Sequence, residues 1–457
     1  MDILRYIIKY NHWWNAGEIN KNMTQDIKRS EFEQIMDLLD SKRITMLVGP
    51  RRCGMTTLLY QSIDELLKRG VKPSNIIFFD GDDALIFDSH ITIGDIFSIY
   101  ERDILGNNVE DINEKVYIVV DNISFLKDWS LYLKNYLKEY PNIKFIMSSS
   151  IASNIFKIAK EELISKMDII NIFPLKTNQF VDSHLFFNAD SMNFTSLLPK
   201  VSLFEDPKQY FESLREKMPN LLFYENKINN IVNKYLLAGG YPEFRETSKI
   251  DLWQKRTNQD IISHGFFRDI MSLYSIKNPY KLVELFYYLA KNDGNTFSYN
   301  SIGQELKLDN ETVLEYITFL RKAGYLIIET VYSKHSYFEY KSPKRILFLD
   351  NGIRNSIVRE TSMNIDLKKK CARTSLNFLA FMSCLDNNWN LFYESKNNHN
   401  IVIDKINSNL VIKPKFTNNV TPDDFSKIDD NTINIVVTSS LLDYKDNTYY
   451  IPFWLVN

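Results

Sequence analysis

The stretch GPRRCGMTTLL, residues 49–59, decides how the first part of the chain folds. From Gly49 to Thr56 it follows the pattern of a phosphate-binding loop, in which two glycines separated by four residues precede a lysine and then a serine or threonine. The lysine position holds Met55 instead. Such a loop wraps phosphate oxygens with backbone N–H groups, and the helix that follows adds positive potential from its N-terminus. The pattern therefore predicts a short strand, a phosphate-binding loop and a helix.

The segments that follow alternate between strands and helices. Helix-length segments separate five apolar runs, and this alternation predicts a parallel sheet with helices on both faces. The runs cover residues 43–49, 75–80, 116–121, 143–150 and 167–175. Parallel sheets bind ligands at the carboxyl ends of their strands. Four residues fall at such ends, namely Gly49, Asp80, Asp121 and Ser148.

The loop and the third strand together supply the ligands of a predicted nucleotide site. We expect Thr56 to ligate a magnesium ion directly and Asp121 to hold it through water. The cofactor expected is ATP or ADP with Mg²⁺. The predicted nucleotide-binding residues are Gly49, Pro50, Arg51, Arg52, Cys53, Gly54, Met55, Thr56 and Thr57.

Two positions of this site lack the side chains that phosphate cleavage needs. Met55 is about as long as lysine but uncharged, so a charge-assisted contact worth roughly 1.5–3 kcal/mol is missing. Asn122 follows Asp121, where a glutamate usually orients the attacking water, and an amide cannot accept a proton. Losing a general base costs about 10²–10⁴-fold in rate. We therefore expect impaired hydrolysis, with Arg51, Arg52 or a residue in trans as alternative sources of charge.

The sequence pattern of the second half of the chain predicts two further modules. Three helices and two strands between residues 280 and 345 are typical of a winged helix. A helix at 373–385 and several short strands then indicate a small mixed α/β module.

Seven stretches, taken in order, resemble one known family. They are NHWW (11–14), GPRRCGMTTLLYQ (49–61), VVDNISFLKDW (119–129), IMSSS (146–150), FPLKTNQF (173–180), LAGGYPE (237–243) and RILFLDNGIRNSI (346–357). With the winged helix, the chain resembles archaeal and bacterial P-loop ATPases that carry an AAA-type core, a winged helix and a C-terminal nuclease-like domain of the DUF4143 type.

The resemblance implies an α/β fold in which a P-loop NTPase parallel sheet is followed by a winged helix and a small mixed α/β domain like that of restriction endonucleases. The implied parts are an N-terminal extension (1–40), an AAA-like core (41–205), a helical lid region (206–275), a winged helix (276–348) and a degenerate nuclease-like domain (349–457).

The resemblance also assigns roles to individual residues. Ser148 or Ser149 is expected to be the polar sensor near the γ-phosphate. Gly240 and Pro242 resemble an element that packs beside the adenine. Arg268 is a candidate phosphate sensor, with a surface salt bridge as the alternative.

The chain departs from the family in the nuclease-like part as well. NIVID (400–404) and IKPKF (412–416) stand where two metal-binding strands are usual. Asn400, Val402 and Lys413 replace carboxylates there, and only Lys415 remains. Asp404 alone cannot build a metal site, so we expect no nuclease activity.

Charge gives little support to DNA binding. The whole chain carries a net charge of −2. In the predicted recognition helix, Glu311 and Glu315 lie on the side expected to face solvent and would repel phosphates. Lys334, Lys341, Lys344 and Arg345, with His335, form a modest basic patch in the wing, so DNA contact and packing against a protein partner both stay open.

Composition favours a cytoplasmic protein. The three cysteines form no C-x-x-C pair, and no run approaches 18 apolar residues, which predicts no membrane contact. Trp13 and Trp14 are expected to pack against the core, and the run LKKKCAR (367–373) to be solvated.

Three functions fit these residues. The first is a degenerate AAA-type ATPase that binds nucleotide as a structural or switching ligand and acts through protein or DNA contacts. The second is a slow ATPase that uses Arg51, Arg52 or a residue in trans. The third is a DNA-binding regulator whose P-loop domain is a scaffold. The oligomeric state is left open.

Overall fold

The computed structural model describes most of the chain as two compact units, Met1–Phe173 and Pro174–Asn457. We describe each unit by itself. The described residues are 3–25, 28–88, 91–150, 159, 163–188, 192–246, 249–270, 276, 278–332, 344–394, 400–405, 408–419 and 431–457.

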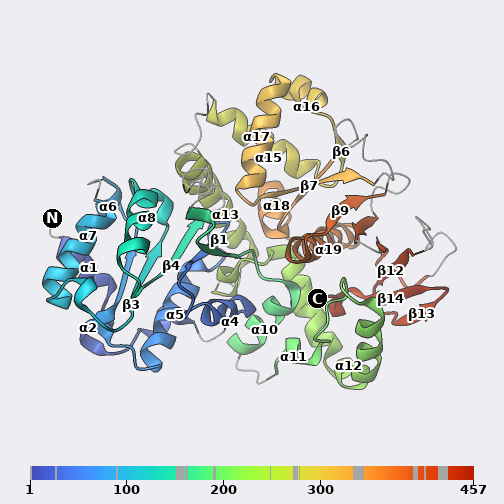
Figure 1. Cartoon of the computed structure of the whole chain (residues 1–457). Coiled ribbons are helices and arrows are strands. Elements are labelled where there is room, and N and C mark those ends of the chain that lie inside the picture. Colours follow the sequence, from blue (N-terminus) through green and yellow to red (C-terminus); the bar gives the residue numbers. More distant parts are fainter. Residues whose placement is uncertain are drawn as a thin grey trace. The chain divides into compact units, whose positions relative to one another are not determined.

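The first unit is built on a five-stranded parallel sheet with the strand order β2-β3-β4-β1-β5 (Figure 1). The predicted α/β fold and its five strands are confirmed, except that the fifth strand ends at Asn171 rather than at residue 175. The strands are β1 (Ile44–Gly49), β2 (Ile76–Asp80), β3 (Val116–Asp121), β4 (Ile143–Ser150) and β5 (Met167–Asn171).

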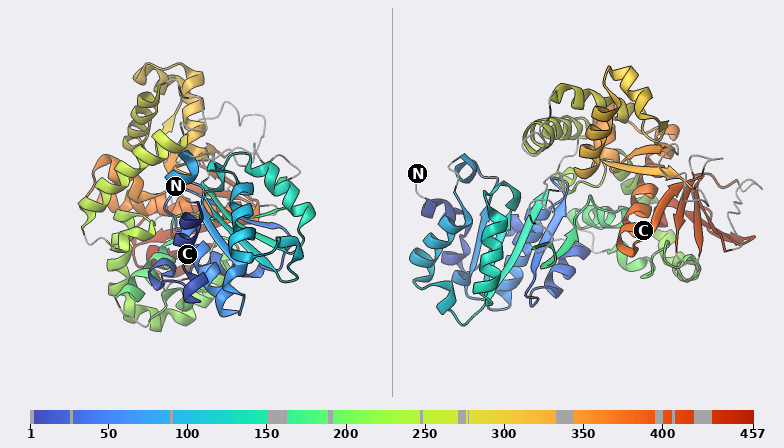
Figure 2. Two further views of the ribbon diagram at one scale, coloured as in Figure 1. Left: turned by 90° about the vertical axis from the view of Figure 1, so that its left-hand side faces the viewer. Right: turned by 45° about the horizontal axis from the view of Figure 1, so that its top comes forward.

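The central strands are buried along their whole length. Every residue of β1, β3 and β4 is buried, which is the pattern of strands covered on both faces. Helices flank the sheet on both sides (Figure 2). They are α1 (Ile3–Tyr10), α2 (Trp13–Ala16), α3 (Lys21–Thr24), α4 (Ser30–Asp37), α5 (Met55–Lys68), α6 (Ala84–Asp88), α7 (Ile93–Tyr100) and α8 (Trp129–Glu139).

Side chains from the N-terminus cover the free edge of β2. The Asn11 side chain accepts a hydrogen bond from the Phe78 N–H at 2.6 Å and donates one to the Phe78 carbonyl at 2.7 Å. The indole N–H groups of Trp13 and Trp14 both donate to the Ile76 carbonyl, at 3.2 and 2.8 Å. Both indoles are therefore structural, as predicted, and the edge strand has no unpaired backbone groups at these positions.

The second unit begins with helices. The longest is α12 (Pro207–Ala238), which spans 32 residues and ends at Gly239. The three helices and two strands predicted between residues 280 and 345 are present. The helices are α10 (Thr177–Phe187), α11 (Phe194–Leu197), α12, α13 (Ile250–Asp260), α15 (Pro279–Lys291), α16 (Tyr299–Leu306), α17 (Asn310–Lys322), α18 (Asn351–Val358) and α19 (Ile365–Asn387), and a π-helix, η6 (Ile261–Ile270), continues α13.

One nine-stranded sheet runs through the C-terminal part of this unit, in the order β13-β14-β12-β11-β10-β9-β7-β8-β6. Strands β7 and β9 pair in parallel, with Thr330 opposite Phe392, so the sheet crosses the predicted boundary between residues 348 and 349. The strands are β6 (Thr296–Phe297), β7 (Leu326–Val331), β8 (Lys344–Phe348), β9 (Asn390–Tyr393), β10 (Ile401–Asp404), β11 (Asn409–Pro414), β12 (Ile433–Thr438), β13 (Asp443–Lys445) and β14 (Thr448–Pro452).

Candidate functional site

The loop between β1 and α5 has the backbone of an anion-binding turn. Arg52 and Gly54 adopt positive φ angles of 68° and 92°. Gly54 caps α5 without a side-chain hydrogen bond, so no cap side chain occupies the N–H groups of the first helical turn. A Cβ on Gly49 would lie 1.8 Å from the carbonyl oxygen of Ile172, so the close approach of the neighbouring chain requires glycine there.

Three side chains meet below this helix start. The hydroxyl of Thr56 donates to Oδ2 of Asp121 at 2.5 Å, and the hydroxyl of Ser148 donates to Oδ1. The N–H of Asn122 in turn donates to the Ser148 hydroxyl at 2.9 Å. The carboxyl ends of β3 and β4 thus join the first turn of α5 in one polar chain.

The donor set fits a magnesium ion. Mg²⁺ prefers oxygen ligands, and here a hydroxyl and a carboxylate are adjacent. Asp121 is only 2% exposed, and this burial raises the pKa of its carboxyl, although the hydrogen bonds from Ser148 and Thr56 oppose the shift. A bound cation would relieve the cost of the buried negative charge.

Asn122 is held by a second carboxylate. Its backbone is left-handed, with φ 52°, and its side-chain N–H donates to Oδ1 of Asp80 at 3.0 Å. Burial, and then the negative charge of Asp121, raise the pKa of Asp80 to about 6. Asp80 stands at the end of β2, a position that the strand pattern identified without giving it a role.

The charges that could replace the missing lysine lie elsewhere in the loop. Met55 is 6% exposed and contributes no charge. The guanidinium of Arg51 donates to Asp82 at 2.9 Å and lies 5.5 Å from the centre of the Phe125 ring. Arg52 is exposed. In this structure Arg51 is therefore engaged by an acid of the β2–α6 connection.

Arg29 supports the loop from outside and was not predicted from the sequence. Its Nη1 donates to the Cys53 carbonyl at 2.7 Å, and its Nη2 donates to the Phe173 carbonyl at 2.9 Å. Its Nη2 also lies 2.7 Å from the buried Glu31. Although burial opposes ionisation of Glu31, the Arg29 guanidinium lowers the pKa of that carboxyl below its usual value. Arg29 lies 20 residues before Gly49, and no spacing rule links the two.

Residues 41–181 match a family model described as "AAA domain". That segment contains β1, the loop, α5 and the polar chain at Asp121. Residues 41–181 form an AAA-type P-loop domain. A second model, the domain of unknown function DUF8612, matches residues 229–364.

Two curated relatives and one solved structure are similar over most of the chain. An uncharacterized protein of Methanocaldococcus jannaschii is 24% identical over 82% of this chain and 75% of its own length. An uncharacterized protein of Haemophilus influenzae is 19% identical over 74% of each chain. The Walker-type ATPase of Pyrococcus abyssi is 14% identical, with a TM-score of 0.45 over 73% of this chain and 97% of its own.

The two serines proposed as sensors of the AAA-type P-loop domain differ. Ser148 contacts Asp121, whereas the hydroxyl of Ser149 donates to the Ser150 carbonyl at 3.4 Å. Side chains alternate along a strand, so only one of the two serines faces the site.

The side chain of Arg268, the candidate phosphate sensor, lies outside the described residues.

Gly240 and Pro242 belong to the second unit, and their adenine-side role stays a prediction. The Gly240 N–H donates to Oδ2 of Asp350 at 2.7 Å, and its carbonyl accepts from the Leu175 N–H at 2.7 Å. A Cβ at Gly240 would lie 2.3 Å from the Leu175 carbonyl oxygen. Packing alone therefore accounts for glycine at this position. Pro242 starts the short helix η5 (Pro242–Glu246).

The predicted DNA contact of Arg345 is wrong. Its side chain is fully buried, and it forms a salt bridge with the equally buried Glu329. Lys344 is half-buried, and its ammonium lies 5.4 Å from the centre of the Tyr299 ring. Lys334 and Lys341 lie outside the described residues.

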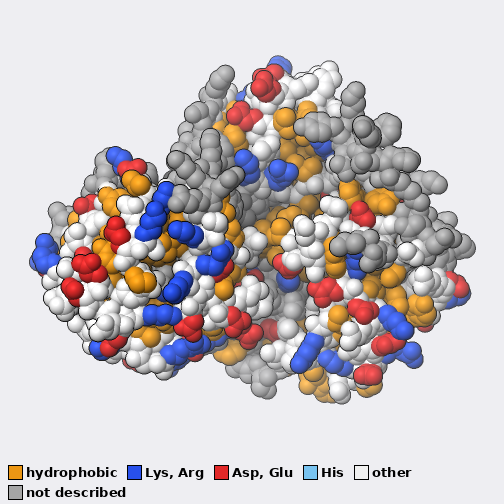
Figure 3. Space-filling view, viewed as in Figure 1, with side chains coloured by type: hydrophobic (Ala, Val, Ile, Leu, Met, Phe, Trp, Pro, Cys, Tyr) orange, Lys and Arg blue, Asp and Glu red, His pale blue; other side chains and the backbone are white. Residues whose placement is uncertain are grey.

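The acidic face predicted for α17 is present, and the visible surface carries both signs of charge. Glu311 and Glu315 are exposed. Lysine and arginine side chains are interspersed with acids over the described surface in Figure 3.

No helix among the residues that the structure describes has the length and apolarity needed to cross a membrane.

The strands expected to resemble a nuclease site pair antiparallel as β10 and β11. Asn400 precedes β10, and its amide donates to Glu394 at 2.6 Å, while Lys413 is buried in β11. Over the described ranges, no three His, Cys, Asp or Glu side chains come together as a metal site.

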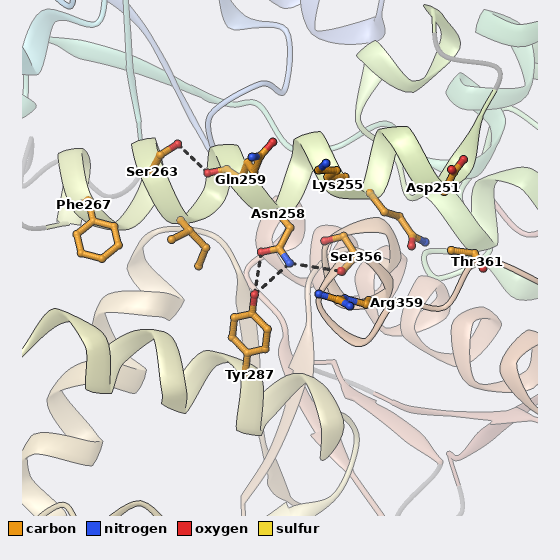
Figure 4. Close-up of a pocket in the computed structure, with 12 residues that line it drawn as sticks. Asp251, Lys255, Asn258, Gln259, Ser263, Phe267, Tyr287, Ser356, Arg359 and Thr361 are labelled. Atoms are coloured by element: carbon orange, nitrogen blue, oxygen red, sulfur yellow. Dashed lines mark hydrogen bonds between the residues drawn. The ribbon is translucent and has the colours of Figure 1, made fainter.

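A cavity of about 980 Å³ lies in the second unit, between α13 with η6 and the helices α15 and α18 (Figure 4). On its wall the Asn258 amide donates to the Tyr287 hydroxyl at 3.1 Å and to the Ser356 carbonyl at 3.5 Å. These hydrogen bonds link α13, α15 and α18. None of the predicted nucleotide-site residues lines this cavity.

Proposed function

We propose that the AAA-type P-loop domain binds ATP or ADP with Mg²⁺ and hydrolyses it slowly or not at all, so that the nucleotide is a structural or switching ligand. One observation carries this proposal. Thr56, Asp121 and Ser148 are assembled beside the start of α5, where the N-cap residue Gly54 makes no side-chain hydrogen bond. Position 55 in the same loop is an uncharged methionine, and the position after Asp121 is an amide bonded to Asp80.

We expect nucleotide binding to be kept and cleavage to be impaired, because the backbone groups that bind phosphate remain while the lysine and the general base are missing. Backbone N–H groups supply much of the phosphate contact in such a loop, and a side-chain substitution leaves them in place. Removing the lysine weakens binding by roughly 1.5–3 kcal/mol, which reduces affinity without abolishing it. Cleavage suffers more, because charge develops on the phosphate in the transition state and no base activates the water.

Calorimetric titration of the full chain with ATP in Mg²⁺ tests nucleotide binding. We expect wild-type protein to bind, and Asp121→Asn to weaken Mg²⁺-dependent binding by about tenfold or more, since it removes the carboxylate charge at the metal. Asp128→Asn, an exposed acid later in the same connection, is the matched control and should bind like wild type. Absence of any binding to wild-type protein would refute the proposal.

A slow ATPase is the second candidate, because Arg51 lies in the loop itself. Release from Asp82 would free its guanidinium for phosphate. If Arg51 supplies the missing charge, Arg51→Met abolishes residual phosphate release, whereas Arg52→Met leaves it intact. Equal rates for both variants and wild type would exclude this role.

We also infer that residues 276–348 form a winged helix that contacts protein rather than DNA. The exposed acids of α17 and the burial of Arg345 support this inference. Electrophoretic mobility shifts with duplex DNA at low salt test it: we expect no shift, and DNA binding that weakens steeply with salt would contradict it.

A further inference from the structure

One long helical face lines the cavity between α13 with η6 and the helices α15 and α18. Along this face Asp251, Lys255, Gln259, Ser263 and Phe267 follow one another every four residues, and all five are exposed. Residues four apart lie on the same side of a helix. At a rise of no more than about 1.5 Å per residue, this row spans roughly 20 Å. The lining of the cavity is therefore elongated.

A hydrogen bond between two helices fixes one end of the cavity. The Gln254 amide, only 4% exposed, donates to the Glu360 carbonyl at 2.6 Å. Lys255 follows the first of these residues, and Arg359, the C-cap of α18, precedes the second. The bonded pair thus brings Lys255 and Arg359 to the same end of the cavity from different helices (Figure 4).

These two cations have no acidic partner among the residues that the structure describes. Both are exposed, and no carboxylate oxygen of the described residues lies within 4.0 Å of the Lys255 ammonium or the Arg359 guanidinium. Asp251 also lines the cavity, one turn before Lys255, and forms no ion pair with it. Two cations and one acid leave this end of the cavity positive, which favours a carboxylate.

The other end of the cavity is apolar and aromatic. Ile262 and Phe267 line it there. Phe267 is 38% exposed, and the centre of its ring lies 6.0 Å from that of Tyr280, which is 77% exposed. Figure 4 shows Phe267 at the left of the view, away from Lys255 and Arg359. Burial of these exposed rings would favour a large apolar side chain.

The lining also offers groups that can pair with a peptide backbone. Gln259 and Thr361 are exposed, and their side chains form no hydrogen bond with the described residues. An amide and a hydroxyl can both donate and accept, as the N–H and C=O groups of an extended chain require. The seven residues from Lys255 to Ile262 cover about 10 Å of helix, which equals three residues of extended chain at about 3.3 Å each.

We propose that this cavity binds an extended segment of a partner protein, about six residues long at about 3.3 Å per residue. In this segment an acidic and a large apolar side chain are about three or four residues apart. Lys255 and Arg359 receive the carboxylate, and Ile262 and Phe267 receive the apolar side chain. An elongated lining with different chemistry at its two ends favours a peptide over a compact small molecule. The cavity shares no residue with the P-loop, so this inference does not depend on the proposed nucleotide function.

An array of acetylated and amidated hexapeptides, probed with labelled full-chain protein, tests the proposal. Each peptide carries one glutamate and one leucine at a defined spacing and in either order, among uncharged polar residues. Matched peptides carry glutamine in place of glutamate. We expect the strongest binding at a spacing of about three or four residues, and weaker binding of the glutamine peptides. Absence of binding above the polar background, or equal binding of glutamate and glutamine peptides, would overturn the proposal.

Fluorescence anisotropy with the best peptide assigns the acidic side chain to its place. Lys255→Met/Arg359→Met should weaken binding by about three- to tenfold, since exposed ion pairs contribute little each. The same variant should bind the glutamine peptide as wild-type protein does. Lys249→Met/Arg256→Met removes one exposed lysine and one exposed arginine from the N-cap and body of α13, outside the cavity, and should bind both peptides like wild type. Equal weakening in the two double variants would overturn the proposal.

Phe267→Ala tests the apolar end. It should weaken binding of the leucine peptide by about fivefold or more, because less apolar surface is buried, and leave a matched alanine peptide unaffected. Equal effects on both peptides would contradict the assignment of this end.

Other occupants of the cavity predict other results. Dimerisation in sedimentation that Lys255→Met/Arg359→Met abolishes would assign the cavity to a second copy of the chain, and displacement of the peptide by a single-stranded oligonucleotide would assign it to nucleic acid. Either result would overturn the proposal. The unfolding midpoint of the double variant should match that of wild-type protein, since both side chains are exposed. Lys255→Gln/Arg359→Gln serves if the methionine variant does not fold.

Discussion

At the scale of single residues, the proposed nucleotide site combines a P-loop backbone with only part of the side-chain set that phosphate cleavage needs. Thr56, Asp121 and Ser148 were predicted from their positions because the ends of parallel strands and the loop after β1 share one edge of the sheet. Arg29 and the pairing of Arg51 with Asp82 were not predicted. Those contacts depend on the path of the chain between elements, which no local pattern encodes.

We predict that Asp350 makes the stability of the second unit depend on pH. Burial raises the pKa of this carboxyl to about 6, although N–H groups of Gly240 and Ile353 bond to it. The unfolded value is about 3.9, so between pH 4 and 6 the native state holds the proton more tightly than the unfolded state. Stability therefore falls as pH rises through this window, by about 2–3 kcal/mol, and is level above it.

Urea unfolding of wild-type and Asp350→Asn protein at several pH values between 4.5 and 7.5 checks this prediction. Asparagine does not titrate, so wild-type protein should lose stability relative to the variant as pH rises. The exposed Asp366→Asn is the control and should follow the wild-type curve. A constant difference between wild-type protein and Asp350→Asn across the range would show that Asp350 is not the titrating group.

At the scale of elements, periodicity and turn residues predicted most helices and strands, since each is specified by its own residues. The long-range pairing of β7 with β9 was not predicted, because Thr330 and Phe392 are far apart in sequence and each strand is short. For the residues that cover the edge of β2, the sequence predicted only that Trp13 and Trp14 pack against the core. Hydrogen bonding by Asn11, Trp13 and Trp14 depends on the three-dimensional path of the N-terminus.

Asn11→Ala tests the cover on the β2 edge. The substitution leaves the N–H and carbonyl of Phe78 without their partner in a buried setting. We expect it to lower the free energy of unfolding by about 2–4 kcal/mol, since each unpaired buried group costs about 1–3 kcal/mol. Chemical denaturation measures this, with the exposed Asn15→Ala as the control. Equal losses in the two variants would mean that water readily replaces the side chain.

At the scale of the whole molecule, the continuous sheet binds the predicted winged-helix and nuclease-like segments into one structure. A chain that stops after residue 349 would lose β9, and the edge of β7 would be exposed. We expect the fragment 1–349 to aggregate, because an unpaired edge strand recruits other strands. Size-exclusion chromatography checks this, and a soluble monomer with a sharp unfolding transition would show that the sheet is not needed for residues 174–349 to fold.

The central claim is that this P-loop holds nucleotide without cleaving it efficiently because Met55 and Asn122 replace a lysine and a glutamate. Phosphate release from ATP and Mg²⁺ by wild-type protein, Met55→Lys, Asn122→Glu and the double variant tests it most directly. We predict negligible turnover by wild-type protein and a rise of at least about 10²-fold in the double variant, which regains a general base and a phosphate-binding charge. Rapid release by unmodified protein would contradict the account.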